Sequence, residues 1–190
     1  SGHIVPPNSY HLPCIVDDDA RCFSARDYAK ILRQDVTIRK YLKTKIPMTA
    51  LSRIEIERSL QNVIITINTG KPGVVIGRGG QGIEALKKGI RHILMGQGSY
   101  NIKVNVQEIA KPDQDAQTIV GNIAEQIEKR LPFRRVIKQT VEGIMNGGAL
   151  GATVMLAGRL NGAEIARTEM LGKGALPLQT LRAEIDYSRG

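Results

Sequence analysis

Glycines and one arginine form the cluster in this chain whose residue types and spacing best suit a chemical task. They are Gly77, Arg78, Gly79 and Gly80, with Gly82 just beyond them. Because glycine has no Cβ, a phosphate group can approach its main-chain N–H closely, and the arginine adds one full positive charge. A helix that begins after the cluster would point its N-terminus, which favours anions, at the same phosphate. The cluster therefore predicts phosphate binding.

Two motifs describe these glycines, and they predict different classes of protein. GxGxxG suggests an NAD-binding enzyme, and it requires a buried strand before the cluster and an acid about 20 residues later. Glu108 lies late for that acid, and only Val74-Val75-Ile76 follow a Pro-Gly pair before the glycines. The next expected strand alternates apolar and polar residues, whereas a parallel Rossmann strand is apolar on both faces. The enzyme is therefore the less favoured alternative.

The elements around the cluster favour the second motif, GxxG. Apolar residues at helical spacing and alternating residues predict the order helix, strand, strand, short helix, loop, helix, strand. The predicted ranges are a helix from about Ser24 with Tyr28, Ile31, Leu32, Val36 and Ile38 as its apolar face, strands at 54–56 and 63–67, a short helix at 74–76, a helix from Ile83 to about Met95, and a strand at 102–106. This order resembles a KH domain, in which a GxxG loop binds a nucleic-acid backbone.

Charge and composition narrow the partners further. The chain has 27 Lys and Arg against 18 Asp and Glu, a net charge of +9, which attracts polyanions. We find no apolar run of the ~18 residues that span a bilayer and no signal-peptide pattern, so we expect no membrane partner. Aromatic residues make up 4% with no Trp, which argues against RNA-binding folds that stack bases on several rings.

The remaining reactive residues predict no catalysis, cofactor or metal. Cys14 and Cys22 lack further ligands at zinc spacing, so we expect reduced thiols in a cytoplasmic or organellar compartment. Neither a catalytic triad nor a Walker loop occurs, and no small-molecule substrate is expected. Residues 1–23 are predicted to be an irregular tail, in which Asp17-Asp18-Asp19 forms a solvated acidic turn.

A domain junction is predicted at Lys111-Pro112-Asp113, which divides the chain into units at 24–110 and 111–190. The predicted elements of the second unit are helices at 116–130 and 132–145, strands at 152–160 and 163–169, and a strand at 181–187. Asn161-Gly162 between the first two strands is a strong hairpin signal. The whole chain is thus expected to be α+β.

Cations gather on the second predicted helix of that unit. Arg134, Arg135 and Lys138 are three or four residues apart, so they share one helical face, opposite an apolar core face. Arg159, Arg167 and Lys173 could extend this basic surface from the hairpin. Arg159 or Arg167 could equally form an ion pair with Glu164 or Glu169.

Several stretches resemble the family of the bacterial-type third protein of the small ribosomal subunit, S-three. They cover nearly the whole chain in the family's order. The matching stretches are 2–12, 52–58, 71–80, 132–135 with Lys138, 158–169 and 181–187. The loop carries only Arg78 where relatives often have two basic residues, and the family normally adds one more strand after Asp186-Tyr187.

The resemblance implies a type II KH domain, a three-stranded sheet with helices on one face, followed by a smaller α/β domain of two helices and an antiparallel sheet. It implies a structural constituent of the small-subunit head whose partners are small-subunit rRNA, mRNA and neighbouring ribosomal proteins. By motif match, Arg134, Arg135 and Lys138 fall on positions linked to mRNA entry and unwinding. The alternative from the same motif is a free KH-domain RNA-binding factor.

Overall fold

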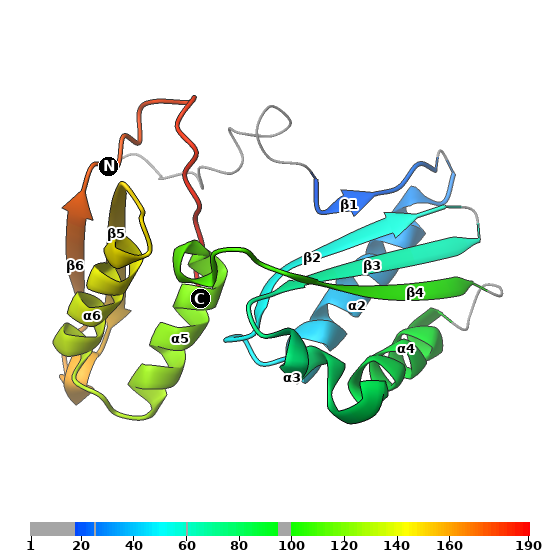
Figure 1. The fold of residues 1–190 in the computed structure, drawn as a ribbon, viewed down its shortest axis with the longest axis horizontal. Helices are drawn as coiled ribbons and strands as arrows, with labels where there is room; N and C mark the ends of the chain where they lie inside the picture. The colour runs from blue at the N-terminus through cyan, green and yellow to red at the C-terminus, as the bar shows by residue number, and fades with distance from the viewer. Residues whose placement is uncertain (1–17, 25, 60, 95–99) are drawn as a thin grey trace. The chain divides into compact units, whose positions relative to one another are not determined.

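The computed structural model describes residues 18–24, 26–59, 61–94 and 100–190. The predictions made for the rest of the tail, Cys14 included, and for the end of the helix near Met95 lie outside these residues. The described chain packs as two units, residues 18–110 and residues 111–190. Each unit has its own sheet (Figure 1), and each has its own apolar core.

The first unit is a four-stranded sheet in the order β1-β2-β3-β4. Its elements are β1 (Ala20–Arg21), α2 (Tyr28–Lys45), β2 (Leu51–Arg58), β3 (Asn62–Thr69), α3 (Pro72–Ile76), α4 (Gln81–Leu94) and β4 (Asn101–Glu108). β2 and β3 are antiparallel, whereas β1 pairs with β2 and β4 pairs with β3 in parallel. The predicted helix at 74–76 is confirmed, so the glycine cluster follows a helix and not the strand that a dinucleotide fingerprint needs.

One face of this sheet forms the core. Ile54, Ile65 and Val104 alternate with half-buried or exposed neighbours along their strands, and they pack with buried residues of all three helices. Because residues two apart along a strand point to the same side, α2, α3 and α4 must cover the same face. The α4 residues Leu86, Ile90 and Leu94 are buried as the helical spacing predicts.

The apolar face predicted for the first helix is partly wrong. Ile38 is buried, but Leu32 and Val36 are 46% and 44% exposed. The buried face instead includes Asp35, whose carboxylate accepts a 2.7 Å hydrogen bond from Nε of Arg58. Burial raises the pKa of the Asp35 carboxyl above its ordinary value, and the charge of Arg58 opposes this shift. The ion pair with Arg58 thus places an acid in the buried face of the helix, which apolar spacing alone does not select.

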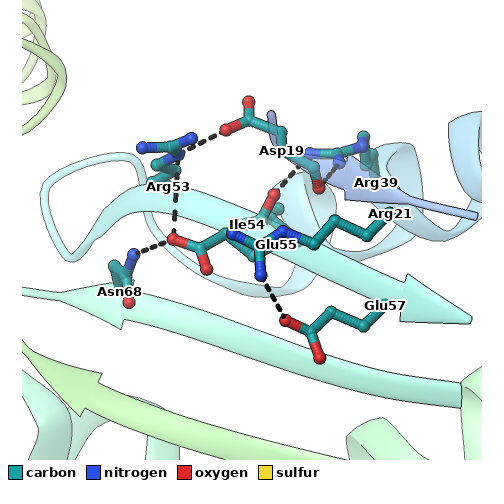
Figure 2. A network of polar contacts seen from close by, with 8 residues as sticks. All are labelled: Asp19, Arg21, Arg39, Arg53, Ile54, Glu55, Glu57 and Asn68. Atoms are coloured by element: carbon teal, nitrogen blue, oxygen red, sulfur yellow. Dashed lines mark hydrogen bonds and ion pairs between the residues drawn. The ribbon is translucent and has the colours of Figure 1, made fainter. Parts of the chain in front are cut away.

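The short strand β1 was not predicted, and it lies in what sequence patterns treat as tail. Figure 2 shows why it is held at the sheet edge: Arg53 contacts the Asp19 carboxylate, and Arg39 of α2 donates 2.6 Å hydrogen bonds to the carbonyls of Asp19 and Ile54. Arg21 of β1 also lies 3.6 Å from a carboxylate oxygen of Glu57. Asp19 is therefore part of a tertiary network and not a purely solvated turn.

The second unit contains two helices and one hairpin. Its elements are α5 (Ala116–Glu128), α6 (Phe133–Asn146), β5 (Gly151–Gly158) and β6 (Arg167–Gly174), and β5 and β6 are antiparallel. Phe133, Ile137 and Val141 of α6 are buried against Val154 and Leu156 of β5. The two helices and the antiparallel pair agree with the predicted α/β unit.

Two details of that unit differ from the predictions. Asn161 and Gly162 do adopt positive φ, but they lie inside a longer loop, so the second strand begins at Arg167 and not at 163. Residues 181–187 form no strand. One of these residues contacts α5 instead: Asp186 accepts a 2.8 Å hydrogen bond from the N–H of Ala116, where the helix dipole favours a carboxylate.

Candidate nucleic-acid interface

The glycine cluster forms the connection between α3 and α4. Gly77, Gly79 and Gly80 have φ of +70°, +61° and +78°, a conformation that side chains with a Cβ rarely adopt. A single 3₁₀ turn, Arg78–Gly80, fills the space between the two helices. The cluster is therefore glycine-rich because its backbone requires it.

Space around the loop differs sharply from one glycine to the next. A Cβ on Gly79 or Gly80 would meet nothing within 4 Å, so the outer side of the loop is open to a ligand. A Cβ on Gly82 would lie 2.5 Å from the carbonyl oxygen of Val75 and 2.8 Å from that of Ile76. Gly82 thus permits the close approach of α4 to α3, whereas Gly79 and Gly80 keep an exposed main chain accessible.

A buried threonine supports the entry into this loop, and sequence patterns missed it. Thr69, at the end of β3, is 0% exposed. Its hydroxyl donates to the carbonyl of Ala50 and accepts a 3.0 Å hydrogen bond from the N–H of Lys71. The hydroxyl therefore fixes the chain where it leaves the sheet for α3. Only the Thr-x-Lys-Pro spacing could have suggested it.

The loop carries the chemistry that a phosphate needs. Arg78 is exposed, and none of the ion pairs found among the described residues includes it. The α4 helix begins at Gln81 and runs for 14 residues, so its positive end lies next to the open glycines. Val74 and Ile76 of α3 are 55% and 36% exposed, which places apolar surface beside this charge.

The second candidate surface lies at the start of α6. Arg134, Arg135 and Lys138 are all exposed, and Phe133, Val136 and Ile137 are buried on the opposite side. The predicted division of this helix into a basic face and a core face is therefore present. Arg134 also lies over the Phe133 ring, 5.7 Å from its centroid.

Arg134 has an acidic neighbour that neither alternative for the hairpin anticipated. Its guanidinium lies 3.6 Å from a carboxylate oxygen of Glu169, and both side chains are accessible to solvent. Such an exposed pair is worth at most about 1 kcal/mol, so a phosphate can compete for the arginine. Arg135 and Lys138 have no ion-pair partner within the described ranges.

The hairpin residues divide into two groups. Arg167, at the start of β6, lines a shallow pocket of about 240 Å³ together with Arg134 and Asn161, so it adds to the basic surface of α6. Arg159 donates a 2.9 Å hydrogen bond to the carbonyl of Ala163 and so helps to shape the loop. Lys173 pairs in register with Ala152, at the opposite end of the hairpin from Arg167, and does not join this cluster.

The described residues contain no group of three or more His, Cys, Asp or Glu that could hold a metal ion. Cys22 is a free thiol. Of the helices that the described residues form, none combines the length and the apolar character that crossing a membrane requires.

Comparison with known proteins gives both units a family. Residues 37–114 match the KH domain family, and residues 123–189 match the family described as ribosomal protein S3, C-terminal domain. Small ribosomal subunit protein uS3 of Syntrophomonas wolfei subsp. wolfei is 42% identical over 186 residues, which are 98% of this chain and 80% of that protein. The proteins of the same name from Ligilactobacillus salivarius and Caldicellulosiruptor saccharolyticus are 44% and 45% identical over 98% of this chain and over 84% and 83% of their own lengths. The chain therefore belongs to the uS3 family of small ribosomal subunit proteins, with an RNA-binding KH domain followed by the S3 C-terminal domain.

Proposed function

We propose that this protein binds small-subunit rRNA through the loop Gly77–Gly80 and that the basic face of α6 borders the path of incoming mRNA. Neighbouring small-subunit proteins are its other partners. Two kinds of RNA contact on one chain follow from its two units, each of which carries its own exposed cations. The protein does no covalent chemistry: it positions charge.

The observation that carries the first half is the open side of the glycine loop. Gly79 and Gly80 present main chain with no neighbouring atoms where a Cβ would stand, beside Arg78 and the start of α4. A phosphate there would receive main-chain N–H donors, a guanidinium and the helix dipole together. The exposed Val74 and Ile76 offer apolar surface to the bases that such a backbone carries.

The test of this contact introduces carboxylates where the phosphate should lie. The full chain with Arg78→Asp and Gly79→Asp should bind small-subunit rRNA much more weakly while its thermal melt is preserved, because both positions are exposed. Asp also tolerates the positive φ of position 79 better than most residues do. A control variant with Lys103→Glu and Gln107→Glu on β4 lowers the net charge by the same three units. It should bind rRNA nearly normally. Equal affinity of the loop variant and the control would refute the contact.

The second half, mRNA contact and help with unwinding, rests on Arg135 and Lys138. These exposed cations without ion-pair partners in the described structure lie on a rigid helix whose core face is fixed by Phe133 and Ile137. Guanidinium and ammonium groups hold phosphates without reading bases, so the contact should not depend on sequence. If all three cations of the face touch a single strand, the log-log salt slope should change by roughly 2. The ribosome's translocation would supply the work of unwinding.

Elongation timing tests this role. Ribosomes that carry Arg134→Ala, Arg135→Ala and Lys138→Ala should assemble, because the buried side of α6 is unchanged. They should translate unstructured messages at a near-normal rate but slow down at a stable hairpin ahead of the decoding site. Equal slowing on paired templates with and without the hairpin would mean that these residues serve assembly or rRNA packing instead.

A further inference from the structure

Helix α2 carries much of the positive charge of the protein. Its 18 residues include six cations, Lys30, Arg33, Arg39, Lys40, Lys43 and Lys45, and one acid, Asp35. Six minus one gives a net charge of +5 for this helix, against +9 for the whole chain. No sequence motif marked this helix, and neither RNA contact proposed above uses it.

The structure sorts these charges into internal and external ones. Arg39 donates its hydrogen bonds to the carbonyls of Asp19 and Ile54, as Figure 2 shows, and Asp35 is buried against Arg58. The other five cations are exposed, and none has an ion-pair partner among the residues that the structure describes. The outer surface of α2 therefore has five free cations and no carboxylate from its own helix.

Spacing places most of these cations along one side. Lys30 and Arg33 are neighbours three residues apart, Lys40 lies two turns beyond Arg33, and Lys43 follows three residues later. We call these four residues the α2 stripe. At 1.5 Å per residue the stripe is about 20 Å long, on a helix that packing of Ile38 and Leu42 holds rigid.

Helix stability does not explain the stripe. Lys30 lies in the first turn, which contains no acid beyond the N-cap residue Asp27, so the positive end of the helix dipole opposes the charge of Lys30. The pairs Lys30–Arg33 and Lys40–Lys43 place like charges on adjacent turns, which is also unfavourable. Only Lys43 and Lys45, in the last turn, have the favourable interaction with the dipole that an ordinary surface helix uses. A polyanionic partner would turn the unfavourable terms into favourable ones.

We propose that the α2 stripe is a second RNA-binding surface of the KH unit, which holds the phosphate backbone of a paired RNA segment. A rigid row of cations about 20 Å long suits a ligand whose phosphates are themselves held in fixed rows, as in an A-form duplex. The glycine loop would bind the flexible single strand. The inference shares with the proposed function only that RNA is the partner, and the two surfaces can be removed separately.

The test measures binding of the full chain to a mixed-sequence RNA duplex of about 16 base pairs and to an unstructured single strand. The stripe variant carries Lys30→Gln, Arg33→Gln and Lys40→Gln, which keep helix-forming side chains. A control removes three exposed cations elsewhere, Lys111→Gln, Arg182→Gln and Arg189→Gln. The loop variant Arg78→Asp with Gly79→Asp completes the set, and circular dichroism verifies that each variant is folded.

At about 0.9 per phosphate contact, three lost contacts should lower the salt slope for the duplex by about 2.7. Raising the salt from about 50 to about 200 mM should then cost the original protein about 40-fold more affinity than the stripe variant. Single-strand binding should change little in the stripe variant and fall in the loop variant. A stripe variant whose duplex binding matches that of the control would overturn the inference. If the loop variant instead keeps its affinity for the single strand, the proposed loop contact is refuted and the inference about the stripe is unaffected.

Discussion

The close approach of α4 to α3 at Gly82 gives the sharpest stability prediction. In Gly82→Ala, the new Cβ would stand 2.5 Å and 2.8 Å from two carbonyl oxygens of α3, distances that real Cβ atoms essentially never show. Because these neighbours are main chain, no side-chain rotation can relieve the overlap, and the helices must separate. Overpacking of this kind costs up to about 3 kcal/mol, and the better helix propensity of alanine offsets about 1 kcal/mol. The net expectation is a loss of about 2 kcal/mol.

Gly73→Ala is the matched control, because a Cβ there meets nothing within 4 Å and the position lies in α3. It should be neutral or stabilise the protein by up to about 1 kcal/mol. Native-state hydrogen exchange, resolved by mass spectrometry, can measure the loss of stability of each helix separately in the two variants. Amides of α4 should exchange about 30-fold faster in Gly82→Ala, while amides of α6 in the other unit should serve as an unchanged reference. In Gly82→Ala, RNA affinity should fall together with the protection of the α4 amides from exchange, because the glycine loop lies between the displaced helices. Indistinguishable exchange in the two variants would refute this account of Gly82.

Three further predictions concern the supports of the two units. Thr69→Val should lower the free energy of unfolding in urea by about 1–3 kcal/mol, because it leaves the buried carbonyl of Ala50 and the part-buried N–H of Lys71 without their hydroxyl partner. A change within error would show that the hydroxyl is dispensable. Because the pKa of Asp35 is raised on folding, the native state binds its proton more tightly than the unfolded chain, so the unfolding free energy should rise relative to Asp35→Asn as the pH falls through that raised pKa toward 3.8. If the unfolding free energy instead falls relative to that of Asp35→Asn over the same pH range, folding lowers the pKa of Asp35 and the reasoning is wrong. Elastase should cut the free protein near Ala110 and leave a stable N-terminal fragment, and cleavage mainly inside α4 would contradict independent folding of the two units.

Local patterns were sufficient for much of the first unit. Alternation in β2, β3 and β4 placed Ile54, Ile65 and Val104 on one face, and helical spacing placed Leu86 and Ile90 of α4 in the core. These elements follow their own periodicity because they are amphipathic against a single core. The place of the glycines between a short helix and a longer one was also predictable, since it follows from the order of the surrounding elements.

What could not be predicted depends on contacts between distant residues. Strand β1 exists because Asp19 meets Arg53 and Arg39, and no local pattern in a two-residue strand reveals such partners. The burial of Asp35 needs Arg58, 23 residues away, so apolar spacing alone identified only part of the buried face of α2. Residues 181–187 have a strand-like alternation, but Asp186 binds the start of α5, which sequence spacing cannot show.

The same reasoning explains why the candidate surfaces are unequal. The α6 face could be read from helical spacing alone, yet the contact of Arg134 with Glu169 depends on how β6 packs against that helix. Lys173 has the right charge, but it lies at the end of the hairpin opposite Arg167. Only the strand register shows this position. The α2 stripe escaped notice because its charge becomes informative only once Asp35 and Arg39 are known to be internal.

Contact between the glycine loop and rRNA is the claim on which the rest depends, and site-specific photocrosslinking tests it most directly. A photoreactive amino acid in place of Arg78 should leave the fold intact, because the side chain is exposed at the outer side of the loop. Irradiation of assembled small subunits should attach position 78 to small-subunit rRNA at one narrow site, and the added Gly79→Asp change should abolish that product. Crosslinks from position 78 only to protein, or none at all in subunits that contain the chain, would contradict the account.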